Sequence, residues 1–352
     1  MRTALALLVL SGCNNEPFKL DTGDTADTGL VQCGRIRGTE AVLMYQDGGT
    51  TVRSPLEAPD AADLASGIAG PLGDPGTYVA IGATRALVSL DYGCNWEAQG
   101  ALPAGDWRAR AAGARVYAFD MASAAGARSD DLGLTWTPFD AVEPFIGVPV
   151  VDTTNPERLR GLQARGVVTS SDGGETWSVG AGLPPELTGP TDGDIAAGNT
   201  DIAVVGGGNG AWRTDNGGTS WAPVLPDVAV TALAIHPDDP AVVFAQATDA
   251  EGVHTISRTA DSGATWARQV DSAQIPLSSA PELWPVPGDT GRALTAYGPV
   301  FNENVGADGL NLYILAAGEG TRTVFVGTWF HLNQVAFGED RWMAAVDAVS
   351  AR

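Results

Sequence analysis

Short apolar runs, many of them alternating with polar residues, follow one another along most of the chain. Clusters of Gly, Pro, Asn and Asp separate them. The stretch from 228 to 270 illustrates the pattern and predicts four strands, at 228–236, 242–247, 252–259 and 266–270. Alternation of period 2 between turn-forming clusters is typical of strands. The pattern therefore predicts an all-β protein.

One signature, Ser/Thr-x-Asp-x-Gly-x-Thr-Trp, recurs from residue 45 onward. The copies lie at 45–52, 89–96, 129–136, 170–177, 214–221, 259–266 and 302–308, the first and last being weaker. Their acidic or amide residues and tryptophans are Asp47, Asp91, Trp96, Asp131, Trp136, Asp172, Trp177, Asn216, Trp221, Asp261, Trp266 and Asn304. Successive Asp or Asn positions are 40 to 45 residues apart. Such a period, with several short strands in each repeat, predicts a β-propeller with one four-stranded blade per repeat.

The residue types of this signature have a structural explanation. The Asp carboxylate can accept backbone N–H bonds within its own turn, and Gly supplies the positive φ of a tight hairpin. The Ser or Thr hydroxyl ties the preceding strand to the turn, and the Trp ring can be buried between blades. We therefore assign these residues a structural role. The alternative is that they are paired catalytic carboxylates or calcium sites.

The two ends of the repeat region complement each other. Before the first copy there is room for one clear strand, at 41–46. After the last copy and its strand at 310–317, further strands are expected at 334–338 and 341–349. We expect these C-terminal strands to join the N-terminal pair in one shared blade, which closes a ring of seven blades and removes its sheet edges.

The repeated signature resembles that of the Asp-box (BNR-repeat) propellers, which include sialidases, sortilin-type sorting receptors, xyloglucanases and Ycf48-like photosystem assembly factors. In 230–245 an apolar strand ends in His236-Pro237-Asp238-Asp239-Pro240 and a second strand follows. This segment looks most like the sortilin, xyloglucanase and Ycf48 branch. The resemblance covers about residues 40–350. It implies a seven-bladed propeller of antiparallel blades, and it does not imply one particular activity.

The charge balance excludes two classes of partner. The 352 residues contain 20 Lys plus Arg against 42 Asp plus Glu, a net charge of −22. Such a chain repels phosphate backbones and anionic lipid, so we expect no nucleic-acid binding and no docking through a basic patch. Lys19 is the only lysine, and we interpret the many arginines as genome composition. Hydrophobic residues make up 44%, enough for a large core.

The N-terminus has the form of a targeting signal. A positive start is followed by the apolar run 4–10 and by Leu10-Ser11-Gly12-Cys13. This is a signal peptide in form, and it resembles the bacterial lipobox, which implies cleavage before Cys13 and acylation of that residue. Asn14 after the cysteine implies sorting to the outer membrane. The alternative is an ordinary secretory signal with an incidental cysteine.

The expected organisation is a signal peptide at 1–12, a lipidated cysteine with an acidic tether at 13–30, and a single propeller domain at 31–352. The tether repeats an Asp-Thr-small triplet, which predicts an extended, solvated segment. Several acyl chains would anchor the protein stably. We expect a monomer at the bacterial outer membrane or cell surface, with a periplasm-facing orientation left open.

Two cysteines remain after Cys13. Cys33 precedes the first blade and Cys94 lies in the second signature copy. An oxidising envelope compartment permits a disulfide between them, which would pin the N-terminal segment onto the neighbouring blade. The alternative is two unpaired thiols.

No catalytic or metal constellation is visible outside the signature copies. His236, His254 and His331 have no metal-ligand spacing, so we expect no metal and no cofactor. A glycosidase needs two carboxylates flanking a sugar cleft, and the sequence singles out no such pair. The arginine triad that the resemblance to sialidases implies cannot be assembled either. Catalytic residues therefore stay unassigned.

One aromatic constellation is a candidate ligand site. Trp107, Trp284 and Trp329 fall in the stretches that lead into the first strand of a blade. In a propeller these connections lie around the channel mouth, opposite the signature turns. Exposed aromatic rings there would suit glycan stacking or a protein hot spot. The alternative is that all three are packed between blades.

These observations favour a lipid-anchored binding or assembly module for a protein or a glycan. The alternative is a glycoside hydrolase or sialidase-type enzyme on the same fold. The residues do not decide whether the chain has any catalytic activity.

Overall fold

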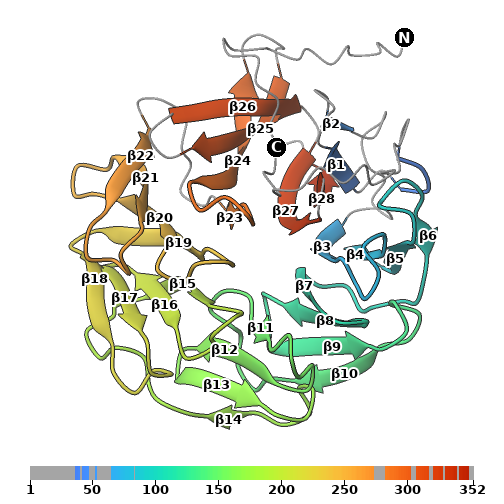
Figure 1. Ribbon diagram of the computed structural model, residues 1–352, viewed down its shortest axis with the longest axis horizontal. Coiled ribbons are helices and arrows are strands. Elements are labelled where there is room, and N and C mark those ends of the chain that lie inside the picture. Colours follow the sequence, from blue (N-terminus) through green and yellow to red (C-terminus); the bar gives the residue numbers. More distant parts are fainter. Residues whose placement is uncertain are drawn as a thin grey trace.

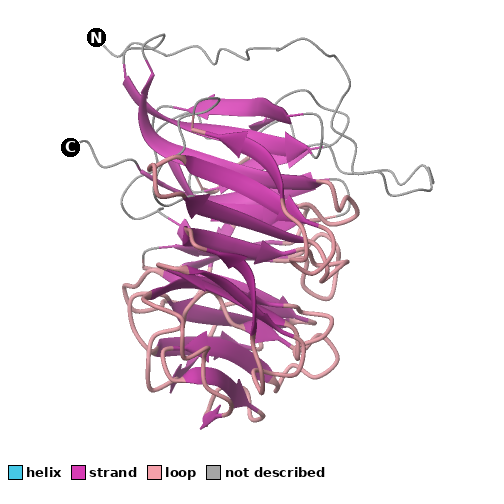
Figure 2. Cartoon of the chain, turned by 90° about the vertical axis from the view of Figure 1, so that its left-hand side faces the viewer, coloured by secondary structure: helices cyan, strands magenta, loops and turns pink. Residues whose placement is uncertain are grey.

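The computed structural model describes residues 36–39, 42–46, 52–53, 65–82, 84–272, 282–302, 307–316, 320–327, 330–338 and 341–348. Within these ranges all of the regular secondary structure is β-strand. The strands form seven four-stranded antiparallel sheets, which are arranged as blades around a ring (Figure 1). Figure 2, turned by 90°, shows that strands make up most of the described part of the chain and that loops connect them on both sides. The predicted all-β propeller is therefore confirmed.

The blades are numbered here from the first complete one, and within each the first strand lies innermost (Figure 1). Blade 1 contains β3 (Ala65–Ala69), β4 (Tyr78–Gly82), β5 (Ala86–Ser89) and β6 (Glu97–Ala98). Blade 2 contains β7 (Trp107–Ala112), β8 (Arg115–Asp120), β9 (Ala125–Ser129) and β10 (Thr137–Asp140). Blade 3 contains β11 (Val150–Val151), β12 (Leu159–Gln163), β13 (Gly166–Ser170) and β14 (Ser178–Val179). Blade 4 contains β15 (Pro190–Ile195), β16 (Ala203–Gly207), β17 (Gly210–Thr214) and β18 (Ala222–Pro226).

Blade 5 contains β19 (Ala229–Ile235), β20 (Val243–Thr248), β21 (His254–Thr259) and β22 (Ala267–Asp271). These bounds confirm the four strands predicted for this stretch to within two residues. Blade 6 contains β23 (Glu282–Pro285), β24 (Arg292–Asn302), β25 (Ala307–Ala316) and β26 (Gly320–Gly327). Blade 7 contains β27 (Phe330–Phe337), β28 (Arg341–Ala348), β1 (Val42–Gln46) and β2 (Val52–Arg53).

Blade 7 is built from both ends of the chain. Strand β1 pairs antiparallel with β28, from Val42 opposite Ala345 to Gln46 opposite Arg341. The C-terminal strands supply the inner half of the blade and the N-terminal strands the outer half (Figure 1). The predicted shared blade is therefore confirmed, and it closes the ring.

Apolar side chains fill the spaces between neighbouring blades. Between blades 2 and 3, Phe119 and Phe145 are buried with ring centroids 5.6 Å apart, and Trp177 lies 5.2 Å from Phe145. Such aromatic pairs contribute about 0.5–1.5 kcal/mol beyond the area they bury. Strands buried on both faces, such as β4 and β16, are the ones that lie between two such layers. The core of the ring is therefore a series of inter-blade clusters.

The signature residues form one repeated turn between the third and fourth strands of a blade, which we call the box turn. In the blade 3 copy, Ser170 Oγ accepts the Gly174 N–H at 2.9 Å, and Asp172 Oδ1 accepts the Thr176 N–H at 2.9 Å. The Trp177 indole N–H donates to Gly174 O at 3.0 Å. The φ of Gly174 is +93°, a conformation that glycine adopts without strain. The carboxylate is thus occupied within its own turn.

The same Ser or Thr to Gly bond and the same Asp or Asn to backbone N–H bond recur in the box turns of blades 1, 2, 4 and 5. The Thr176 hydroxyl and N–H lower the pKa of Asp172 to about 2, and the corresponding bonds do the same for Asp261. A carboxylate held ionised by its own turn is a poor proton donor.

The two weaker copies of the signature occupy different places in their blades. Asp47 lies outside the described residues, between the third and fourth strands of blade 7. Asn304 also lies outside them, but β24 and β25 on either side of it are the second and third strands of blade 6. Asn304 therefore stands at a different place in its blade from the other signature copies. A long hairpin happens to fall at the repeat spacing, and the strand expected at 310–317 is the third strand of its blade.

Candidate functional site

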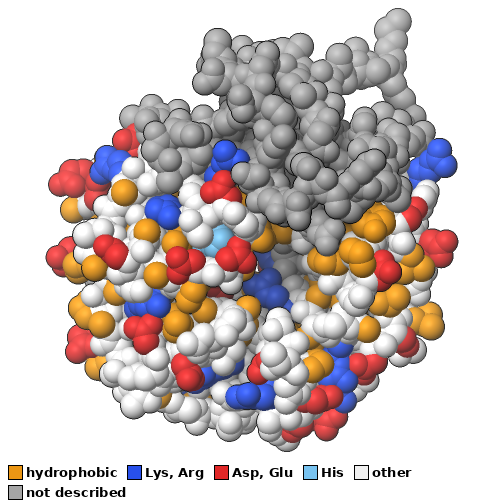
Figure 3. Space-filling model, in the orientation of Figure 1, with side chains coloured by type: hydrophobic (Ala, Val, Ile, Leu, Met, Phe, Trp, Pro, Cys, Tyr) orange, Lys and Arg blue, Asp and Glu red, His pale blue; other side chains and the backbone are white. Residues whose placement is uncertain are grey.

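The inner strands surround a central cavity of about 620 Å³. Its wall contains residues from β7, β15, β19, β23 and β27, together with the segment that leads into β11. Figure 3 shows the opening at the centre of the ring, with Lys or Arg side chains visible inside it. The charged residues of this wall are Arg108, Arg110, Asp192, Asp194 and Glu282. We call this cavity the channel.

An ion pair crosses the channel. Arg108 Nη2 of β7 lies 3.0 Å from Glu282 Oε1 of β23, and Arg108 Nη1 lies 2.6 Å from Asp106 Oδ1. Burial alone would lower the pKa of Arg108, but the two carboxylates outweigh it and raise that pKa above its ordinary value. Arg108 is therefore saturated with partners, and its charge is neutralised within the protein.

Two aspartates on β15 bind the backbone of the next blade. Asp192 Oδ2 accepts the Leu233 N–H at 2.7 Å, and Asp194 Oδ2 accepts the Ile235 N–H at 2.8 Å. Burial raises the pKa of Asp192 to about 7, and the charges of Asp194 and Glu282 act in the same direction. Burial also raises the pKa of Asp194. These carboxylates hold blades 4 and 5 together, and both residues also line the channel.

Arg110 is placed differently from Arg108. It lies two residues further along β7 and lines the same channel. Burial lowers its pKa, while the carboxylate of Asp194 acts against that. Within the part of the chain that the structure describes, the Arg110 guanidinium makes no hydrogen bond or close ion pair. Its N–H donors have no acceptor among the described residues, so they can bond another molecule.

The three tryptophans proposed from the sequence as a ligand-binding face do not share one environment. Trp107 is 3% exposed, packs in the cluster between blades 1 and 2, and donates its indole N–H to Pro103 O at 2.9 Å. The expectation that it belongs to an exposed aromatic face is wrong, because the connection before β7 folds over its ring. Trp284 is half-buried and lines the channel. Trp329 lies outside the described residues.

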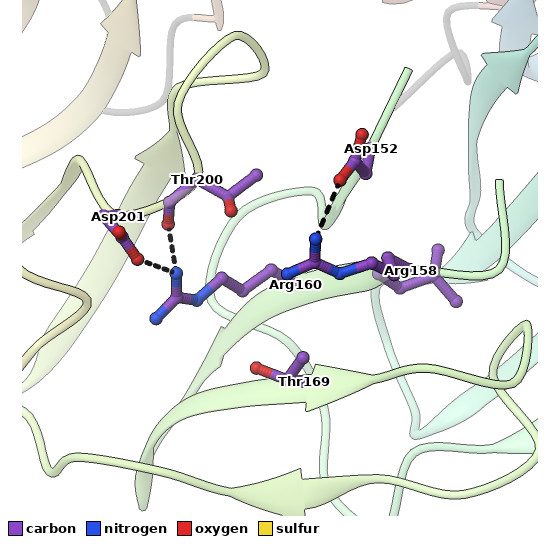
Figure 4. A pocket seen from close by; sticks show the side chains of 7 residues that line it. Asp152, Arg158, Arg160, Thr169, Thr200 and Asp201 are labelled. Carbon is purple, nitrogen blue, oxygen red and sulfur yellow. Dashed lines mark hydrogen bonds and ion pairs between the residues drawn. The ribbon is translucent and has the colours of Figure 1, made fainter. Parts of the chain in front are cut away.

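A second, smaller cavity of about 250 Å³ lies at the rim between blades 3 and 4. Figure 4 shows its charged side chains pairing with one another or with backbone. Arg160 donates to Thr200 O at 2.6 Å and to Asp201 Oδ1 at 2.7 Å, and Arg158 lies 3.4 Å from Asp152. This rim cavity is therefore a junction between blades.

The rim cavity belongs to a pattern that sequence reasoning missed. In blades 2, 4 and 5 an arginine directly precedes the Ser or Thr of the box turn and reaches the next blade. The bonds run from Arg128 to Asp172 O and Gly173 O, from Arg213 to Pro240 O, and from Arg258 to Thr290 O. In blade 3 this position is Thr169, and Arg160 directly opposite it in register supplies the guanidinium. The sequence signal that could have revealed this pattern is an Arg at a fixed place in three of the repeats. The interpretation of the arginines as genome composition alone is therefore wrong for these residues, because they bond neighbouring blades.

The remaining candidates concern cysteine, histidine and metals. Cys94 is disulfide-bonded, and both other cysteines lie outside the described residues, so Cys33 as its partner stays a prediction. Arg37, four residues after Cys33, forms a parallel bridge with Asn95. His236 is buried and bonds Val286 O of blade 6 at 2.8 Å. In the described ranges no three His, Cys, Asp or Glu side chains are grouped so as to hold a metal ion.

No helix among the described residues has the length and hydrophobicity needed to cross a membrane. The residues proposed for lipidation, signal cleavage and tethering, 1–30, lie outside the described ranges.

No protein-family model matches the sequence. A search of curated proteins also finds no match. Many solved structures do resemble the chain in fold. The GH74 xyloglucanase from Xanthomonas campestris superposes with a TM-score of 0.54 at 17% identity, covering 72% of this chain and 45% of that one. The GH74 enzyme of Niastella koreensis gives 0.52 at 20% identity, covering 84% and 42%. The chain thus spans less than half the length of these enzymes.

Ycf48 from Cyanidioschyzon merolae gives a TM-score of 0.57 at 14% identity and covers 86% of this chain and 98% of that one. A structure described as Ycf48 bound to D1 peptide gives 0.53 at 13% identity, covering 89% and 99%. At these identities the similarity shows the propeller fold and not an activity.

Proposed function

We propose that this chain is a lipid-anchored β-propeller of the cell envelope that binds a protein or a glycan in its channel and acts as a binding or assembly module. The channel is the observation that carries the proposal. Its volume of about 620 Å³ lies in the range of ligand sites, and it combines charged groups with an aromatic ring. Arg110 offers hydrogen-bond donors there that the described part of the chain does not use.

The use of the channel carboxylates favours binding over hydrolysis. A glycoside hydrolase needs one carboxyl as acid and one as base or nucleophile on opposite sides of a sugar. Asp192 and Asp194 lie on the same strand, and each accepts a backbone N–H from β19. Glu282 is paired with Arg108. A glycoside hydrolase or sialidase-type enzyme on this fold is the alternative.

The lengths of the similar structures support the same choice. The two Ycf48 chains are matched over nearly their whole length, and one of them is described as bound to a peptide. By contrast, the match covers less than half the length of each GH74 enzyme.

The membrane part of the proposal rests on Leu10 to Cys13. Mass spectrometry of the native N-terminus should find an acylated Cys13, and fractionation should find the protein with the outer membrane. A Cys13→Ala variant should lose both. An unmodified mature chain that begins elsewhere would refute the anchor.

The binding part is tested with the mature chain carrying Cys13→Ser, which keeps the propeller and removes the lipid. We would screen it against a glycan array and a peptide array, and against a panel of fluorogenic glycosides. Binding without turnover is the expected result. Glycoside turnover that disappears in Glu282→Gln would make the chain an enzyme.

A further inference from the structure

The inner strands carry a repeated polar position. In blades 1, 4, 5 and 7 a β-bulge interrupts the pairing of the innermost strand, and the extra residue is polar each time. These residues are Ser66, Thr191, Thr231 and Asn333. A bulge turns a side chain out of the regular alternation and towards a new neighbour.

Three of these four side chains bond the next blade. Ser66 Oγ accepts the Trp107 N–H at 3.1 Å, Thr191 Oγ1 donates to Val230 O at 2.6 Å, and Asn333 donates to Ala65 O at 2.9 Å. Thr231 differs, because its Oγ1 is buried and has no hydrogen-bond partner in the described structure. A buried hydroxyl without a partner costs free energy, and a ligand that bonds it recovers that cost. Thr231 lines the channel.

Arg110 lines the same cavity and also has no hydrogen-bond partner among the described residues, and Trp284 adds an apolar surface. Trp284 lies two residues after Glu282 on β23, so both side chains leave the strand on the same side. The ring is partly exposed to the channel, and within the described residues its indole N–H has no hydrogen bond. The channel therefore combines an aromatic face with a guanidinium and a hydroxyl that have no hydrogen-bond partner among the described residues.

The charges of the channel restrict the ligand. Arg108 is neutralised by Glu282 and Asp106. Arg110 faces the carboxylate of Asp194, so the wall has no net positive charge to offer a phosphate or a polyanion. A strongly cationic ligand would in turn meet the Arg110 guanidinium. A ligand that is uncharged, and that both donates and accepts hydrogen bonds, satisfies the wall with least cost.

We infer that the channel binds an uncharged glycan, with hydroxyl groups accepting from Arg110 and bonding Thr231 and Asp192, and with a sugar ring against Trp284. Sugar hydroxyls can donate and accept at once, and the apolar face of a pyranose suits an indole. This inference rests on the proposed binding function and names its ligand class.

The test uses the mature Cys13→Ser chain and a printed array of neutral, sialylated and sulfated glycans, followed by calorimetry with the strongest neutral oligosaccharide. Neutral glycans should dominate the array. Arg110→Gln, Thr231→Val and Trp284→Ala should each weaken that binding at least tenfold. Ser66→Ala is the control, because Ser66 is a bulge residue that is bonded to the next blade and is not among the residues lining the channel. Circular dichroism and thermal melts establish that each variant is folded.

The possible outcomes distinguish failure of the neutral-glycan inference from failure of the proposed binding function. Binding of neutral glycans that is lost in the three variants and kept in Ser66→Ala supports the inference. Preference for sialylated or sulfated glycans, or neutral binding that survives all three substitutions, overturns it. Capture of peptides without any glycan overturns it as well, while the binding function stands. Absence of binding on both the glycan and the peptide array overturns the inference and the proposed function together.

Discussion

Arg108 of blade 2 and Glu282 of blade 6 meet across the channel at 3.0 Å, although 174 positions separate them in the sequence. The pair ties two blades that are not neighbours in the ring. The Arg108 side chain is only 12% exposed, whereas that of Glu282 is 37% exposed. Glu282 thus pairs from a partly exposed position with a more buried partner.

Glu282→Gln should destabilise the protein by about 1–2 kcal/mol, because a more buried arginine loses one of its two carboxylate partners while solvent screens part of the effect. Urea unfolding of Glu282→Gln, Arg108→Gln and the double variant measures the coupling between the two side chains. A double-mutant cycle on the surface pair Arg268 and Asp271, which lie 3.3 Å apart, is the matched control. It should show a coupling below about 0.5 kcal/mol. Equal coupling in the two cycles would contradict a special role for the channel pair.

Asp192→Asn should stabilise the protein at neutral and alkaline pH. The folded pKa of Asp192 is raised to about 7 from an ordinary 3.8, so its favourable contribution is fully present below the unfolded value and is lost as the pH rises through about 7. Asparagine keeps an acceptor for the Leu233 N–H and has no ionisation cost. Its advantage over the native chain should therefore grow between pH 4 and pH 7 and then level off.

Urea midpoints between pH 4 and pH 8 provide the measurement. Asp227→Asn removes the same charge from an exposed loop position and serves as the control. A constant gain at every pH, matching that of Asp227→Asn, would mean that Asp192 ionises as freely as a surface carboxylate.

Asp172→Ala should lower stability by about 1–3 kcal/mol, because the Thr176 and Ser170 bonds to its carboxylate are lost together. Asp172→Asn should cost less, since Asn216 already makes the equivalent bond to Ser220 in blade 4. With a folded pKa of about 2, the contribution of Asp172 is present above pH 4 and is lost as the pH falls towards 2. The difference between the native chain and Asp172→Asn should narrow over that range. Loss of ligand binding without loss of stability would give the box turns a functional role.

Arg213→Met should lower stability by about 2–3 kcal/mol. The Arg213 side chain is 6% exposed, and its removal leaves Pro240 O without the bond at 2.7 Å and leaves Asp215 without its partner. Arg165→Met is the control, because Arg165 pairs with Glu143 at an exposed position and should change stability by less than about 0.5 kcal/mol. Equal melting temperatures for the two variants would show that the inter-blade arginines are dispensable.

The parts of the fold that follow from local chemistry could be predicted from the sequence. The box turns are closed by residues within eight positions of one another, so their pattern is visible in any one copy. The shared blade followed from counting strands at the two ends. The channel was not predictable in the same way, because strand alternation says which residues share a face and not which residues meet across a ring. Asp192 and Asp194 lie on β15 of blade 4, whereas Arg110 lies on β7 of blade 2.

The errors have the same origin. Trp107 and Trp284 both lie on first strands, but the Pro103 carbonyl draws the Trp107 indole into the core and no such acceptor bonds Trp284 within the described residues. Spacing alone placed Asn304 in a box turn, although the hairpin of β24 and β25 falls at that distance. A repeat period identifies a blade more reliably than it identifies a position within it.

The pairing of β1 with β28 also determines the order in which the molecule can be completed. Val42 and Ala345 are opposite each other and about 300 positions apart, so their contact carries a large loop-closure cost and forms only once the intervening blades are compact. A chain made or exported from its N-terminus therefore presents β1 and β2 as an open sheet edge until residues 341–348 arrive. Blade 7, which closes the ring, can be completed only after the strands of every other blade have been synthesised.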